Sequence, residues 1–212
     1  NITAVRESDL VIIAVKPWRV QSVIEEIRPV LQFDKQIIIS IAAGVTFEQL
    51  NSHLKKSIAS KVQVNPVIFR VMPNTAIEVK SSLTFISACN ASEDQINLVL
   101  SIFNELGKAI LIEERLMEAG TALASSGIAF ALRYIRAAIE GGVELGFYPK
   151  QAQEIVVHTV KGAIDLLLEN QSNPEAEIDK VTTPGGITIK GLNEMELSGF
   201  TSAVIRGLKA SR

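Results

Sequence analysis

The chain has 212 residues, 47% of them hydrophobic, and a mean hydropathy of +0.27, which is enough to bury one large core or two modest ones. A formal net charge of −2, with no cluster of Lys and Arg, argues against nucleic acid or an anionic membrane as the main partner and favours a small-molecule substrate. No uninterrupted apolar run approaches the roughly 18 residues of a membrane span, and Cys89 is the only cysteine, which excludes an internal disulfide and suits a reducing cytoplasm.

The first third of the chain has the pattern of parallel β/α units. A fully apolar strand is predicted at 10–15, a helix at 20–31 and a second apolar strand at 37–41. Sheets of this kind bind ligands at the carboxyl ends of their strands. Those ends hold Ala14-Val15-Lys16-Pro17 and Ser40-Ile41-Ala42-Ala43-Gly44-Val45.

Small residues at these two ends would let the backbone lie flat against a ligand, and Lys16 could meet a phosphate or a ribose. The alternative is that Lys16 is merely solvated and that Ala42-Ala43-Gly44 is a tight turn. The residues alone leave both interpretations open.

Further strands are predicted at 69–72, 83–87 and 109–112, with a helix at 93–106. The strand at 69–72 runs into Pro73-Asn74-Thr75. Asn74 and Thr75 could hydrogen-bond a ligand, but both are also common turn residues that satisfy the local backbone.

After Ile112 the strand pattern stops and the chain is helix-like to its end. We therefore expect two domains, residues 1–113 with a sheet and residues 114–212 with helices only. The apolar helical surface of the second domain is too large to stay exposed, which favours a second copy of the chain as its cover. His53 and His158 have no second ligand at helical spacing, so no metal site is expected.

The run Asp179-Lys180-Val181-Thr182-Thr183-Pro184-Gly185-Gly186-Ile187-Thr188-Ile189-Lys190-Gly191-Leu192 lies between two helical segments. Gly185 and Gly186 can adopt positive φ and let another molecule approach the backbone. Thr188 is the expected N-cap of the helix that follows, where free N–H groups and the helix dipole favour an anion. The alternative is an ordinary turn between helices, capped by a threonine.

This run resembles the C-terminal motif D-K-V-T-[ST]-P-G-G-T-T-I-x-G-L of the Δ1-pyrroline-5-carboxylate reductases, and it fits at every position except Ile187. The segments A-V-K-P, S-I-A-A-G-V and R-V-M-P-N-T resemble earlier motifs of the same family. The resemblance implies a partial Rossmann-like parallel sheet domain followed by an all-α dimerisation domain. It also implies reduction of L-1-pyrroline-5-carboxylate to L-proline, the last step of proline biosynthesis, in the cytoplasm.

The resemblance further assigns ligands and residues. The cofactor would be NADPH, or NADH, bound by Asn1, Ala14, Val15, Lys16, Pro17, Ala42, Ala43, Asn74 and Ser126. The substrate would be bound by Glu114, Lys180, Gly185, Gly186, Ile187 and Thr188, with Thr188 as the catalytic residue. The helices would interleave into a homodimer that can assemble further. The run Asp179–Leu192, called the signature loop from here on, would complete the site of the neighbouring subunit.

Two departures from the family pattern keep a second interpretation open. No G-x-G-x-x-G follows a strand, so the phosphate-binding turn is expected upstream of Asn1, and the segment Ala124-Ser125-Ser126-Gly127-Ile128-Ala129-Phe130 replaces the family's S-G-S-G-P-A-Y. The alternative function is a non-catalytic paralogue that acts as a dimeric interaction module. Reduction of a hydroxy acid is disfavoured because 113–142 contains no lysine-asparagine pair.

Overall fold

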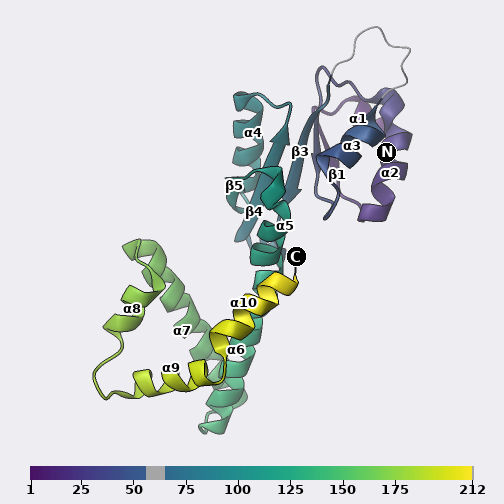
Figure 1. Ribbon diagram of the computed structural model, residues 1–212. Helices are drawn as coiled ribbons and strands as arrows, with labels where there is room; N and C mark the ends of the chain where they lie inside the picture. The colour runs from purple at the N-terminus through teal and green to yellow at the C-terminus, as the bar shows by residue number, and fades with distance from the viewer. Residues whose placement is uncertain (56–64, 212) are drawn as a thin grey trace. The chain divides into compact units, whose positions relative to one another are not determined.

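The computed structural model describes residues 1–55 and 65–211, which divide into two compact units, Asn1–Ser125 and Ser126–Ser211 (Figure 1). The first unit is built on a sheet and the second contains helices. The expected fold class, a partial Rossmann-like parallel sheet domain followed by an all-α domain, is confirmed, with a sheet that is mostly parallel.

Five strands form one sheet in the order β1-β2-β3-β4-β5. Their bounds are Leu10–Ile13 for β1, Ile37–Ser40 for β2, Val67–Met72 for β3, Ser82–Cys89 for β4 and Gly107–Leu111 for β5. The β1–β2, β2–β3 and β4–β5 pairs are parallel, whereas β3 and β4 are antiparallel. β4 and β5 therefore run opposite to β1, β2 and β3, a reversal that the apolar pattern of the strands does not predict. Only the short 3-10 turn Thr75–Val79 joins β3 to β4, and a parallel crossover needs a dozen or more residues.

Helices cover both faces of the sheet, as the apolar strands require. One face packs against α1 (Ile2–Arg6), α2 (Val20–Ile27) and α3 (Phe47–Leu54), and the other packs against α4 (Glu93–Asn104). Within β2, Ile38 faces the first core while Ile37 and Ile39 face the second, because successive side chains point to opposite sides.

The chain leaves the sheet through a continuous helical segment. A 3-10 turn at Glu114–Leu116 leads into α5 (Met117–Gly120), a π-helical turn (Thr121–Ser126) and α6 (Gly127–Glu144). Gly120 lies so close to β4 that a Cβ atom would stand 2.7 Å from the Phe85 ring. The π-helical turn occupies the positions where the family has T-x-L-S-G-S and ends two residues before Ile128, which replaces the family's proline.

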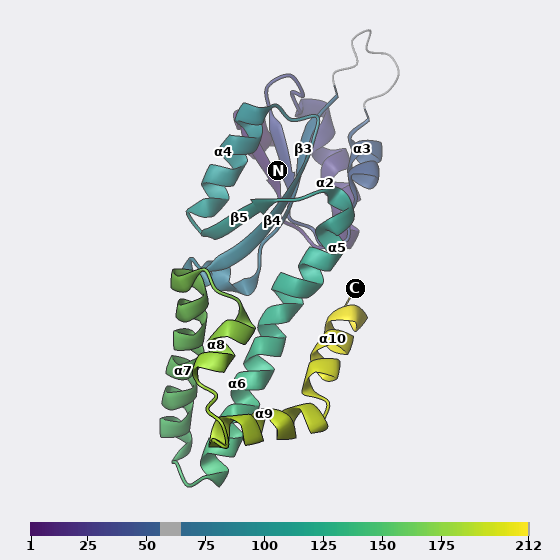
Figure 2. The same ribbon diagram turned by 60° about the vertical axis from the view of Figure 1, so that its left-hand side comes forward.

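The second unit consists of α6, α7 (Pro149–Asn170), α8 (Pro174–Lys180), α9 (Ile187–Leu197) and α10 (Phe200–Ala210). Figure 2 shows α6 running alongside α7. Tyr134 on α6 meets Phe200 edge to face, with ring centroids 6.3 Å apart.

This helical unit has almost no core of its own. Ala152 is the only buried hydrophobic residue among 126–211. Large apolar side chains are exposed on all of its long helices, among them Leu132, Val157, Leu168, Leu197 and Ile205. By length and composition alone, the helical segment Glu114–Glu144 could also cross a membrane. The unit therefore presents an extensive apolar surface that the isolated chain leaves uncovered.

Candidate active site

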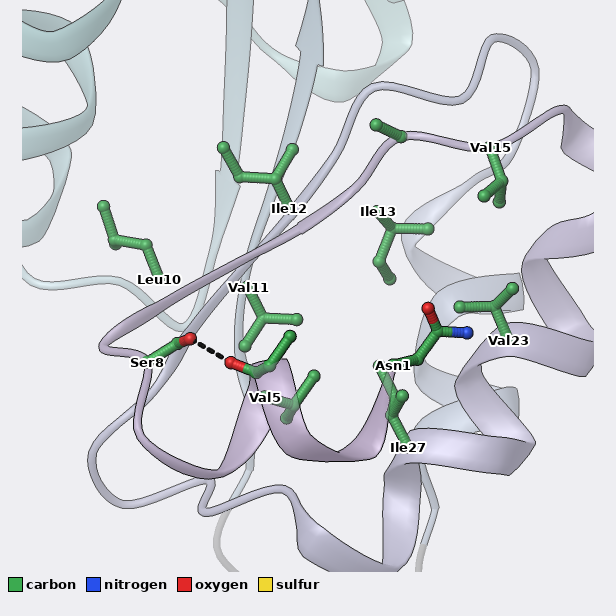
Figure 3. A pocket seen from close by; sticks show the side chains of 12 residues that line it. Asn1, Val5, Ser8, Leu10, Val11, Ile12, Ile13, Val15, Val23 and Ile27 are labelled. Atoms are coloured by element: carbon green, nitrogen blue, oxygen red, sulfur yellow. Dashed lines mark hydrogen bonds between the residues drawn. The ribbon is translucent and has the colours of Figure 1, made fainter.

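A pocket of about 300 Å³ opens along β1, between α1 and α2 (Figure 3). Three of the residues predicted to bind the cofactor, Asn1, Ala14 and Val15, lie in its lining. The rest of the lining is mostly aliphatic, with Val11, Ile13, Val23 and Ile27 among the side chains. Sequence positions that are distant from one another are thus brought together at the carboxyl end of β1.

The polar groups of this pocket already have partners. Asn1 Nδ2 donates to Glu26 Oε2 over 2.8 Å, and the Ser8 hydroxyl donates to the carbonyl of Ala4. Lys16 and Pro17 follow the pocket in an exposed extended turn that leads into the 3-10 turn Pro17–Arg19.

The turn that holds Ala42 and Ala43 follows β2 and is fixed at both ends. At its start, Ser40 is buried and its Oγ lies 3.4 Å from the amide of Ala42. Gly44 then adopts φ +77°, and Thr46 caps α3 through a reciprocal pair of bonds with Gln49. Ala42 is buried, whereas Ala43 is exposed.

Asn74 shows the local bonding of a turn residue. Its Oδ1 accepts from the amide of Ala76 over 3.0 Å, and its Nδ2 lies 3.4 Å from the carbonyl of Ala124. Ser125 Oγ lies 3.4 Å from the carbonyl of Pro73. These bonds tie the end of β3 to the π-helical turn, and they leave a cofactor contact by Asn74 as a prediction.

The structure adds Arg70, to which the sequence analysis gave no role, as the partner of Glu114. Arg70 Nη1 donates to Glu114 Oε1 over 2.8 Å, and the amide of Phe47 donates to the same oxygen over 2.6 Å. The Arg70 side chain is 7% exposed and that of Glu114 is 36% exposed. An arginine in the middle of the apolar strand β3 was the signal in the sequence, because a buried charge requires a partner.

The signature loop forms the entry to α9, which begins two residues earlier than predicted. Gly185 adopts φ +73°, and Gly186, with extended ψ, is the N-cap of the helix. The expectation that Thr188 is the N-cap was wrong. Ile187 and Thr188 already belong to the first turn, because Gly186 can take the cap conformation directly after Gly185.

The backbone N–H groups at the start of α9 differ in whether they already donate a hydrogen bond within the chain. The N–H of Gly186 donates to the carbonyl of Thr183 over 3.0 Å, so it is closed to a ligand. No hydrogen-bond acceptor within the described residues meets the N–H groups of Ile187 and Thr188, which lie in the first helical turn. Ile187 is 88% exposed and Thr188 is half-buried. The arrangement can accept a carboxylate.

Lys180 ends α8 just before this loop and is held by Glu177. Lys180 Nζ donates to Glu177 Oε1 over 2.7 Å, and Ser172 and Asn170 also donate to that oxygen. The hydrogen bonds from Lys180 and then Ser172 lower the pKa of Glu177 below its ordinary value. The side chain of Lys180 is 60% exposed, so a further anion can approach it.

The predicted site residues therefore fall into two groups. Asn1, Ala14, Val15, Lys16, Pro17, Ala42, Ala43, Asn74 and Glu114 belong to the sheet unit. Ser126, Lys180, Gly185, Gly186, Ile187 and Thr188 belong to the helical unit. Groups of His, Cys, Asp and Glu able to hold a metal ion are absent from the residues that the structure describes.

The sheet unit fits one part of a dinucleotide. The small exposed residue Ala43 and the apolar pocket leave room for a flat ring, and the exposed Lys16 lies directly after the pocket. The lining of the pocket carries no basic side chain, and the sequence contains no G-x-G-x-x-G turn for a pyrophosphate.

Two protein families match separate parts of the chain. Residues 114–212 match the family described as pyrroline-5-carboxylate reductase dimerisation. Residues 1–44 match the family described as NADP oxidoreductase, coenzyme F420-dependent.

Two relatives from Dictyostelium discoideum match the whole chain. Pyrroline-5-carboxylate reductase 1 is 40% identical over 223 residues, and pyrroline-5-carboxylate reductase 2 is 38% identical over 224 residues. The chain spans 39% of the length of the first relative and 73% of the second.

Solved structures show the same similarity. A pyrroline-5-carboxylate reductase from Coxiella burnetii is 30% identical with a TM-score of 0.89, and the match covers 99% of this chain and 76% of that one. The Plasmodium falciparum pyrroline carboxylate reductase with NADP bound is 27% identical with a TM-score of 0.86, covering 98% and 76%. From the signature loop, the two-part fold and these matches along its whole length, the chain belongs to the pyrroline-5-carboxylate reductase family.

Proposed function

We propose that the protein containing this chain reduces L-1-pyrroline-5-carboxylate to L-proline with NADPH as the reductant. The observation that carries the proposal is the start of α9, where the unpartnered amides of Ile187 and Thr188 follow the turn at Gly185-Gly186. A helix start of this kind suits the carboxylate of a small ring acid. The family membership supports the same reaction, and the NADP bound in the Plasmodium relative supports the cofactor.

In the proposed mechanism, the chain's residues mainly bind and orient. The amides of Ile187 and Thr188 hold the substrate carboxylate, and Lys180 adds positive charge nearby. The Thr188 hydroxyl hydrogen-bonds the ring nitrogen and fixes the face of the imine. A protonated imine is a good hydride acceptor, so alignment and exclusion of water are the main requirements.

NADPH, when bound, supplies the hydride that the imine carbon accepts, while the ring nitrogen keeps its proton and becomes the amine of proline. We assign the ribose and nicotinamide side of the cofactor to Asn1, Ala14, Val15, Lys16 and Pro17, together with Ala42, Ala43, Asn74 and Ser126. The small side chains among them let the cofactor approach the backbone. NADH would fit the same positions.

We further propose that the working form is a homodimer, which can assemble into larger oligomers, in the cytoplasm. The apolar surface of α6, α7 and α10 supports a second copy as its cover, because the helical unit has almost no core of its own. This assignment also accounts for the apolar segment Glu114–Glu144 without a membrane. In the dimer, the signature loop of one subunit would complete the site of the other.

The proposal is tested by incubating the purified full-length protein with pyrroline-5-carboxylate and NADPH. We expect NADPH oxidation that depends on the substrate, with one proline formed per NADPH consumed. Failure to form proline, by a protein that is folded and dimeric, would favour the alternative of a non-catalytic interaction module. The altered segment 124–130 supports this alternative, as does the sequence without a G-x-G-x-x-G turn.

A further inference from the structure

Arg70 and Glu114 form a bridge across the base of the turn that carries Ala42 and Ala43. Arg70 is paired in register with Ser40, the last residue of β2, so it lies beside the start of the turn. Glu114 accepts from the amide of Phe47, the first residue of α3, and so holds the end of the turn. The 2.8 Å bond between the two side chains closes the bridge.

The bridge also reaches the next predicted cofactor turn. Arg70 lies two residues before Met72, where β3 ends and Pro73-Asn74 begins. Its guanidinium lies 6.0 Å from the centre of the Phe47 ring, and Phe47 is itself buried. Arg70 therefore contacts the element after the first turn from within the strand that leads into the second.

This bridge is not an efficient way to stabilise a fold. Burying an arginine costs solvation that one hydrogen-bonded partner rarely repays, and apolar residues of similar volume often stabilise as well or better. Arg70 Nε is buried and has no hydrogen-bond partner in the part of the chain that the structure describes, which adds to the cost. The charged pair is better explained by its effect on the neighbouring backbone segments, which it holds in fixed positions.

We propose that Arg70 and Glu114 are positioning residues for the nicotinamide cofactor. They hold the turns at Ala42-Ala43 and at Pro73-Asn74 in the conformation that binds the cofactor. This inference rests on the proposed function, because it takes those turns as cofactor contacts. It also gives Glu114 a role through Phe47 and Arg70 that does not require contact with the substrate.

Variants of the two residues separate positioning from simple support of the fold. Glu114→Gln keeps an oxygen that can accept from Phe47 but loses the charge that pairs with Arg70. Arg70→Met removes the pair from the other side with a side chain of similar length, and Arg70→Lys restores the charge. The matched control is Glu113→Gln, which breaks the neighbouring exposed pair with Arg115, whose side chains are 67% and 72% exposed.

The measurement is the dissociation constant for NADPH of the purified full-length protein, from fluorescence titration without substrate, together with KM for each substrate and the melting temperature. A misplaced turn should raise both the dissociation constant for NADPH and the KM for NADPH about tenfold in Glu114→Gln and in Arg70→Met. KM for pyrroline-5-carboxylate should change less, Arg70→Lys should recover part of the loss, and Glu113→Gln should stay within about twofold of wild type.

The inference is overturned if Glu114→Gln and Arg70→Met bind NADPH as wild type does, whether or not their melting temperatures fall. If Arg70→Met does not fold, the same comparison is made with Glu114→Gln alone. A wild-type protein that binds NADPH but does not form proline would contradict the proposed function and leave the NADPH titration as a valid test of the bridge. A wild-type protein that does not bind NADPH would contradict both.

Discussion

Gly186 packs directly on Thr183. Its amide donates to the Thr183 carbonyl over 3.0 Å, and a Cβ atom on Gly186 would stand 2.6 Å from Thr183 Oγ1 and 3.0 Å from that carbonyl oxygen. No side chain fits there unless the loop moves. The two residues therefore set the position of the α9 start, where we place the substrate carboxylate.

Replacing Gly186 with Ala should displace the loop and weaken substrate binding. We expect kcat/KM for pyrroline-5-carboxylate to fall about tenfold or more, because small displacements of a binding group have large kinetic effects. Steady-state kinetics at saturating NADPH measures the change. The double variant Gly186→Ala with Thr183→Ala removes the contact with Oγ1 but keeps that with the carbonyl, so it should recover part of the loss. Unchanged kinetics in the single variant would show that the loop geometry is unimportant.

The bond between Glu177 and Lys180 should make stability depend on pH. The pKa of Glu177 is lowered in the folded protein, first by Lys180 and then by Ser172. Such a group stabilises the fold above its unfolded pKa of about 4.3 and loses this contribution as the pH falls through the lower folded pKa.

Comparing the melting temperatures of wild type and Glu177→Gln across the pH range tests this coupling. Wild type should melt higher near neutral pH, and the difference should shrink below about pH 4.3. The matched control is Asp165→Asn, which breaks the exposed pair between Lys161 and Asp165 on α7. A difference between wild type and Glu177→Gln that stays constant down to acid pH would show that the carboxylate charge does not contribute.

The strands β1 and β2 could be predicted because their residues are apolar, except for Ser40 at the end of β2, and such runs are typical of strands buried on both faces. The antiparallel direction of β4 could not be derived in the same way, since it depends on the short connection Thr75–Val79. The apolar pattern of the residues thus predicts which segments are strands, but it does not predict the direction in which each strand runs.

In the candidate site, too, features carried by neighbouring residues could be predicted from the sequence, whereas contacts between distant residues could not. The signature loop was recognisable from consecutive residues, because two adjacent glycines before a helix favour an exposed turn. The pairing of Arg70 with Glu114 joins residues 44 positions apart and has no local pattern beyond an arginine in an apolar strand. The N-cap was assigned to Thr188 instead of Gly186 because threonine is favoured at caps, whereas the backbone turn at Gly185 decided the start of the helix.

The apolar face of α10 should be needed for dimerisation. Ile205 is 52% exposed in the single chain although it lies on a helix with Phe200 and Val204, which are also exposed. Placing a charge there by Ile205→Glu should dissociate the dimer, because a buried unpaired carboxylate is costly. Light scattering during size-exclusion chromatography measures the mass. Ser202→Glu, which adds the same charge at an exposed polar position of α10, is the comparison. A dimer that survives Ile205→Glu would place the interface elsewhere.

The most direct test of the account is the turnover number of Thr188→Val, measured with pyrroline-5-carboxylate and NADPH both saturating. Valine keeps the shape of threonine at the start of α9 and removes the hydroxyl that we assign to the ring nitrogen. We predict a fall in kcat of about 100-fold, with Thr188→Ser staying within about tenfold of wild type because it keeps the hydroxyl. A Thr188→Val protein with the wild-type kcat would contradict the proposed site.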